Sequence, residues 1–130
     1  MDNGKRNTSL IIYIAGVIIL TFTDQLTKVM AADYLKGKSP FVIIDNVFEL
    51  YYLENSGAAW GVMSGARYFF LILTVVIVAI VIYVSIKMPH TNRMVPLRGT
   101  LILLSAGAVG NFIDRLCFGY VRDFIYFKLI

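Results

Sequence analysis

The stretch YFFLILTVVIVAIVIYVSI, residues 68–86, decides the fold of this chain. It holds nineteen residues without a charge, and Arg67 and Lys87 bound it. A helix rises about 1.5 Å per residue, so this stretch spans about 28 Å as a helix, close to the ~30 Å hydrocarbon thickness of a bilayer. The stretch therefore predicts a helix that crosses a membrane.

The composition of the whole chain agrees with a membrane environment. Of its 130 residues 58% are apolar and 15% charged, and the mean hydropathy is +0.75. Soluble domains average about 45–50% apolar and 25% charged residues, and a domain of this size has little interior in which to hide the excess. An aromatic share of 14% excludes a disordered chain.

Two further apolar runs predict two further spans, so the expected fold is an integral membrane protein, mainly α, with three transmembrane helices in a single domain. The expected segments are a first span at about 9–27, an extracytoplasmic segment at about 28–66, a second span at about 68–86, a cytoplasmic loop at 87–98, a third span at about 97–115 and a tail at 116–130.

The segment between the first two spans predicts a small β-hairpin at about residues 41–53. β-branched and aromatic residues fill Phe41–Ile44 and Val47–Tyr52, and Asp45-Asn46 separates the two runs. Such runs around an Asp-Asn pair are typical of two strands joined by a tight turn.

The charged and metal-binding residue types exclude several classes of partner. The net charge is +4, but the cations are scattered between apolar runs, so we expect lipid headgroups and no nucleic acid as partners. Their density favours a cytoplasmic N-terminus, while their total count favours the opposite orientation. One histidine and one cysteine exclude a multi-histidine metal site and an internal disulfide, and we expect no metal or cofactor. No obligate protein partner is indicated.

Polar residues near the ends of the spans are the candidates for chemistry, because ionised side chains are costly near hydrocarbon. Four are expected at the same face of the membrane: Asp24, Asn55, Asp114 and Asp123. A spacing of three places Asn111 beside Asp114 on one helix face, and Arg115 is expected to form an ion pair with its neighbour Asp114. Two carboxylates that share one proton would suit an aspartic peptidase.

Four blocks of residues, in this order, carry a resemblance to a known family: Asp24-Gln25-x-x-Lys28, Asn55-x-Gly57-Ala58-Ala59-Trp60, Gly110-Asn111-x-x-Asp114-Arg115 and Val121-x-Asp123-Phe124. In these blocks the chain resembles lipoprotein signal peptidase, or signal peptidase II, a family of aspartic proteases of the bacterial inner membrane. The resemblance implies removal of the signal peptide from diacylglyceryl-modified prolipoproteins, before the lipidated cysteine. It also implies a cytoplasmic N-terminus and an active site at the extracytoplasmic face.

The resemblance assigns a role to each matching position. Asp123 matches a catalytic aspartate, and the expected hairpin matches a small extracytoplasmic sheet of the family. The substrate-binding positions are Asn55, Asn111 and Arg115, and the supporting positions are Asp24, Lys28, Gly57 and Asp114.

The second catalytic aspartate of the family lies in an Asn-x-Ala-Asp-Ser block that opens a fourth helix. Residues 1–130 contain no such block. We therefore expect a C-terminally truncated chain whose hydrolytic activity needs the missing carboxylate, because aspartic chemistry uses a pair. Two alternatives are a small membrane transporter, which would need an acid near the middle of a span, and a non-catalytic adaptor that binds prolipoproteins.

Overall fold

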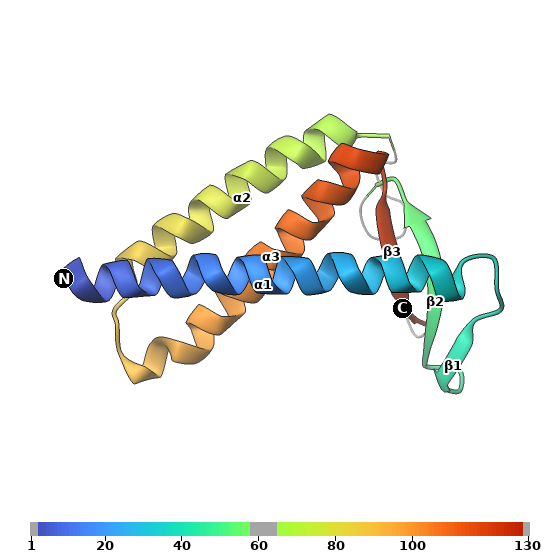
Figure 1. The fold of residues 1–130 in the computed structure, drawn as a ribbon, viewed down its shortest axis with the longest axis horizontal. Helices are drawn as coiled ribbons and strands as arrows, with labels where there is room; N and C mark the ends of the chain where they lie inside the picture. The colour runs from blue at the N-terminus through green and yellow to red at the C-terminus, as the bar shows by residue number, and fades with distance from the viewer. Residues whose placement is uncertain (1–2, 58–64, 129–130) are drawn as a thin grey trace.

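The computed structural model describes residues 3–57 and 65–128 and contains three long helices and a small sheet (Figure 1). The elements are α1 (Asn3–Leu35), β1 (Phe41–Ile44), β2 (Phe48–Asn55), α2 (Arg67–Lys87), the 3-10 turn η2 (Asn92–Met94), α3 (Val95–Phe118) and β3 (Val121–Phe127). Ala58, Ala59 and Trp60 of the second sequence block lie outside the described residues.

The three helices are long and apolar enough to cross a membrane, and they expose their apolar side chains. Few residues of each helix are buried inside the protein. Within the eighteen-residue apolar window of each span, the buried share is 6% in the first span and 22% in the second and the third. Ile11, Phe22 and Ile72 are each about two-thirds exposed. A helix in water would cover such a stripe, so lipid must cover it here. The predicted fold class, an α-helical membrane protein with three spans and a small sheet, is confirmed.

The first helix is longer than the predicted span at both ends. Asp24 and Lys28, which were expected at the C-terminal end of this helix, lie inside α1 and are followed by about two further turns. The helix continues past these charges because they pair with each other one turn apart, Lys28 Nζ lying 3.0 Å from Asp24 Oδ2.

The sheet is antiparallel, with the strand order β1-β2-β3. The expected hairpin is present: Asn46 adopts a left-handed backbone with φ 59°, and the Val47 N–H donates to Ile44 O at 3.0 Å. No helix or strand was predicted for the tail, yet its residues form β3, which pairs with β2 from Phe48↔Phe127 to Asn55↔Val121.

A single glycine makes this third strand possible. Gly119 ends α3 with φ 85°, and its N–H donates to Arg115 O at 3.0 Å. Only glycine adopts this left-handed conformation without strain. The chain turns there and runs along β2, so the whole sheet lies at one end of the three helices (Figure 1). The N-terminus and the loop between α2 and α3 lie at the other end.

Candidate active site

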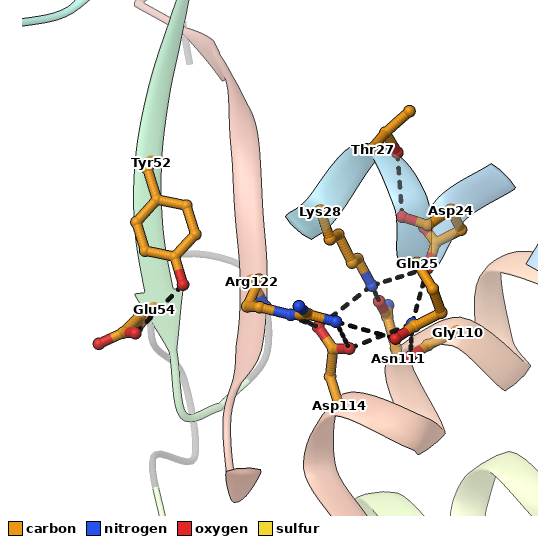
Figure 2. A network of polar contacts seen from close by, with 10 residues as sticks. All are labelled: Asp24, Gln25, Thr27, Lys28, Tyr52, Glu54, Gly110, Asn111, Asp114 and Arg122. Atoms are coloured by element: carbon orange, nitrogen blue, oxygen red, sulfur yellow. Dashed lines mark hydrogen bonds and ion pairs between the residues drawn. The ribbon is translucent and has the colours of Figure 1, made fainter. Parts of the chain in front are cut away.

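A buried network of charged side chains joins α1, α3 and β3 at the sheet end of the molecule (Figure 2). Its centre is Asp114 of α3, whose side chain is 0% exposed. Arg122 of β3 donates three hydrogen bonds to this carboxylate: its backbone N–H at 2.9 Å and Nε at 3.2 Å to Oδ2, and Nη2 at 2.8 Å to Oδ1. A guanidinium that binds both oxygens fixes the carboxylate in orientation as well as in charge.

Lys28 of α1 approaches the same carboxylate from the opposite helix. Its Nζ lies 3.3 Å from Asp114 Oδ2 and 3.0 Å from Asp24 Oδ2, and it donates to Asn111 Oδ1 at 3.0 Å. The Lys28 side chain is 5% exposed. Two carboxylates and two cations therefore balance in one buried site, which is the condition under which buried charges are tolerated.

Gln25 links these groups, although the sequence analysis did not assign it a role. Its Nε2 lies within hydrogen-bond distance of three acceptors, Asp24 Oδ2 at 3.2 Å and both Gly110 O and Asp114 Oδ1 at 3.1 Å. Its Oε1 accepts from Arg122 Nη2 at 2.8 Å. A spacing of three from Lys28 puts both side chains on one face of α1, and that spacing was the available signal.

Close packing of α1 against α3 depends on the absence of a side chain at Gly110. A Cβ at this position would overlap Asp24 Oδ2 and lie 2.8 Å from Asp24 Cγ. Gly110 therefore lets the Asp24 carboxylate rest against the backbone of α3.

Asp123, the residue after Arg122, occupies a different environment. Its half-buried carboxylate accepts a hydrogen bond from the Asn55 side chain. Burial raises the pKa of Asp123, and this outweighs the lowering effects of Asn55 and of the nearby charges of Lys28 and Arg115. The raised pKa keeps a proton on this carboxyl at a higher pH than an exposed aspartate would hold one.

Asn55 and Arg115 are held in place by the backbone of Gly57. The Gly57 N–H donates to Asn55 Oδ1 at 2.9 Å, and the amide nitrogen of Asn55 is the group that can donate to Asp123. Arg115 Nη2 donates to Gly57 O at 3.1 Å, and its guanidinium carbon lies 4.4 Å from the centre of the Phe70 ring.

The prediction of an ion pair between Asp114 and Arg115 is wrong. Asp114 binds Arg122 and Lys28, whereas Arg115 reaches Gly57. Successive side chains on a helix diverge by about 100°, so neighbours in sequence do not face each other.

A second polar group connects the residue after α1 to the sheet, and Figure 2 shows its two members from β2, Tyr52 and Glu54. The Tyr52 hydroxyl donates to Glu54 Oε2 at 3.1 Å, and Lys36 Nζ lies 3.2 Å from the same oxygen. Burial and the Glu54 hydrogen bond raise the pKa of Tyr52 to about 12, so Tyr52 stays a donor.

The eight residues proposed from the sequence thus converge at the sheet end. Asp24, Lys28, Asn111 and Asp114 form the buried network, while Asn55, Gly57, Arg115 and Asp123 lie beside it. Within residues 3–57 and 65–128, no cluster of three or more His, Cys, Asp or Glu side chains is placed to hold a metal ion.

Comparison with known proteins gives the family. Residues 16–130 match the family described as Signal peptidase (SPase) II. The chain belongs to the signal peptidase II family. The resemblance carried by the four sequence blocks is confirmed, and with it the enzyme class, an aspartic peptidase.

Relatives from several bacteria bear the same name. A lipoprotein signal peptidase of Caldanaerobacter subterraneus subsp. tengcongensis is 42% identical over 112 residues, which cover 86% of this chain and 75% of the relative. One from Halothermothrix orenii is 38% identical, with 87% and 76% covered. One from Staphylococcus aureus is 39% identical, with 91% and 69% covered.

Two solved structures share the fold of this signal peptidase II family member. Both are described as bacterial membrane enzymes solved by the in meso method, at 2.3 and 1.9 Å resolution. The first has a TM-score of 0.73 and 38% identity, covering 93% of this chain and 70% of the other. The second has a TM-score of 0.70 and 37% identity, covering 95% and 76%.

Proposed function

We propose that this protein removes signal peptides from prolipoproteins at a membrane surface, and that Asp123 is one of the two carboxylates that the reaction needs. The observation that carries the proposal is the half-buried carboxyl of Asp123, which accepts a hydrogen bond from Asn55 beside a network that holds its strand in place. Burial raises the pKa of this carboxyl. An aspartic peptidase needs one carboxyl that keeps a proton and one that is ionised.

The reaction divides the work between the two carboxyl groups. The ionised partner takes a proton from water as the water oxygen attacks the scissile carbonyl. The C–N bond then breaks, and the leaving nitrogen takes the proton that Asp123 holds. The family resemblance assigns the ionised partner to an Asn-x-Ala-Asp-Ser block, which the 130 residues do not contain.

The residues around Asp123 suit recognition of an extended peptide. We assign Asn55, Asn111 and Arg115 to substrate binding, because amide and guanidinium N–H groups can donate to the carbonyl oxygens of a peptide backbone. Asn111 uses its Oδ1 for Lys28, and its amide N–H groups are donors. The supporting positions keep α1, α3 and β3 in register beneath these donors: Asp24, Lys28, Gly57 and Asp114.

The membrane restricts which peptides reach the site. The protein is a multi-pass membrane protein, and we place it in the bacterial cytoplasmic membrane with the sheet on the extracytoplasmic side. Lys5, Arg6 and Lys87 at the other end support a cytoplasmic N-terminus. The acyl chains of a diacylglyceryl-modified precursor would remain in the bilayer and hold the scissile bond at the surface beside Asp123.

The test is cleavage of a diacylglyceryl-prolipoprotein by the membrane-inserted protein, measured on residues 1–130 and on a chain extended by an Asn-x-Ala-Asp-Ser block and a fourth helix. Residues 1–130 should not cleave the precursor, because the ionised partner is missing, so the variants are compared in the extended chain. Asp123→Asn should lower the rate by at least about 100-fold, the usual contribution of one acid–base group. Asp45→Asn, which removes the same charge from the exposed hairpin turn, should leave the rate unchanged.

Substrate binding is measured in parallel, so that loss of recognition and loss of chemistry are separated. Equal cleavage by Asp123→Asn and the parent chain would remove Asp123 from the mechanism. Tight binding of the precursor by both, with cleavage by neither, would favour the adaptor role.

A further inference from the structure

An open cleft lies at the end of the molecule opposite the sheet. Its lining comes from Lys5 and Arg6 of α1 and from residues 86–90, where α2 ends and the following loop begins. Its volume is about 580 Å³. The proposed peptidase site, at the sheet end, does not involve this cleft.

Three cations face this cleft without a carboxylate to balance them in the described part of the chain. The ion pairs formed by residues 3–57 and 65–128 include none of Lys5, Arg6 and Lys87. The first described carboxylate, Asp24, lies nineteen residues beyond Lys5, about 28 Å along α1. The remaining described carboxylates lie in the last turns of α1 and α3, in the hairpin or in the strands, away from this cleft: Asp33, Asp45, Glu49, Glu54, Asp114 and Asp123.

His90 supplies a hydrogen-bonding group that the rest of the described chain does not use. Both of its ring nitrogens are buried and have no hydrogen-bond partner among the described residues. Arg98 holds the loop that carries His90, because its Nη2 donates to Met88 O at 2.9 Å and to Pro89 O at 3.2 Å. A neutral imidazole always carries one N–H, and an imidazolium carries two. The ring is therefore positioned with donor capacity that remains unused.

The depth of the cleft in the membrane indicates its ligand. Lys87 bounds the charge-free stretch at residues 68–86, so it lies where hydrocarbon gives way to headgroups. Phosphate groups occupy that level, and a phosphate oxygen accepts charge-assisted hydrogen bonds from lysine, arginine and histidine. We infer that this cleft is an anion site for a phosphate group, with Lys5, Arg6 and Lys87 supplying charge and His90, which also lines the cleft, supplying an N–H. The phosphate of a phospholipid headgroup and free phosphate share this chemistry.

The single histidine of the chain makes the inference directly testable. The chain is placed in maltoside micelles, which contain no phosphate, and the imidazole signal of His90 is followed by NMR. Short-chain phosphatidylglycerol is titrated in one arm, inorganic phosphate in a second and diacylglycerol in a third. Burial and the charges of Arg98 and Lys5 lower the pKa of His90, and a bound phosphate should move this pKa upward.

Variants separate a built site from general attraction to positive charge. The double variant Lys5→Gln/Lys87→Gln should weaken phosphatidylglycerol binding at least tenfold. The matched variant Lys36→Gln/Lys38→Gln removes the same charge at the sheet end and should change binding less than twofold. Far-UV circular dichroism checks that both variants keep their helices.

The three titrations distinguish the source of the phosphate. A response to phosphatidylglycerol alone identifies a lipid headgroup site, and an equal response to inorganic phosphate identifies a site for the free ion. The inference is overturned if neither phosphate compound moves the His90 signal, if diacylglycerol moves it equally, or if the two double variants lose binding to the same extent.

Discussion

Asp114 and Asp123 are the same chemical group nine residues apart, and their surroundings differ completely. Asp114 is 0% exposed and receives its contacts from Arg122, Gln25 and Lys28. Asp123 is half-buried, accepts an amide hydrogen bond from Asn55 and has a raised pKa. The comparison teaches that the number of donors around a buried carboxylate decides its use. A buried carboxylate with many donors stays ionised and serves the structure. A buried carboxylate with fewer donors keeps its proton to a higher pH.

The largest expected effect comes from breaking the network at its centre. Asp114→Ala leaves Lys28 and Arg122 buried without their shared carboxylate, which should lower the free energy of unfolding by about 3–5 kcal/mol. Denaturant unfolding in detergent, followed by circular dichroism, measures it. Asp33→Asn on the exposed surface of α1 is the control, with an expected change within about 0.5 kcal/mol. Equal losses in the two variants would show that Asp114 does not hold the fold.

The contact between α1 and α3 can be tested with two glycines of one helix. Gly110→Ala should lower the free energy of unfolding by about 1–3 kcal/mol, since its Cβ would overlap the Asp24 carboxylate. Gly107→Ala has nothing within 4 Å of its Cβ, and it should stabilise the helix by about 0.5–1 kcal/mol. The same unfolding assay compares them, and a result of the same sign for both would contradict the close approach at Gly110.

The pH dependence of stability distinguishes Asp123 from a paired carboxylate. A raised pKa in the folded state means that folding favours the protonated form of Asp123. That contribution is complete below the unfolded-state pKa of about 3.9 and is lost as the pH rises through the folded-state value. Unfolding free energies measured from pH 3.5 to 7 should show this loss in the parent chain. The loss should be absent in Asp123→Asn, and an unchanged pH dependence would contradict the raised pKa.

The smallest expected effect is a shift of the pH–rate profile. The Asn55 hydrogen bond lowers the pKa of Asp123, so Asn55→Ala should raise this pKa further. The limb of the kcat/KM profile that belongs to Asp123 should then move to higher pH. Asn92→Ala, at the exposed start of η2, should leave the profile in place. A shift to lower pH in Asn55→Ala would reverse the assigned direction.

The spans and the hairpin were predictable because their signals are local. The charge-free stretch at residues 68–86 matches the thickness of a bilayer, and Asp45-Asn46 marks a turn between two adjacent runs. β3 was missed because it pairs with a strand about seventy residues earlier, and its Arg122-Asp123 pair interrupts the apolar pattern of a strand. Pairing over such a distance is set by the packing of the whole chain.

The composition of the site was predictable, but its pairing was not. The four sequence blocks contained all eight candidate residues, and these converge at one end. The partner of Asp114 was wrong because Arg122 arrives from β3, an element without a sequence signal. Arg122 was missed for the same reason. Gln25 had a signal in its spacing of three from Lys28, but its contact with Arg122 forms only when α1 and β3 meet.

Arg122 follows Asp114 by eight residues, with a turn at Gly119 between them. This number of residues decides which side chain of β3 faces Asp114. Side chains alternate along a strand. Deleting one residue at the turn would present Asp123 to Asp114, setting two negative charges face to face, and inserting one would present Val121. The length of this connection therefore determines that Asp114 contacts Arg122 in the structural network and that Asp123 stays outside it, where we propose that it is catalytic.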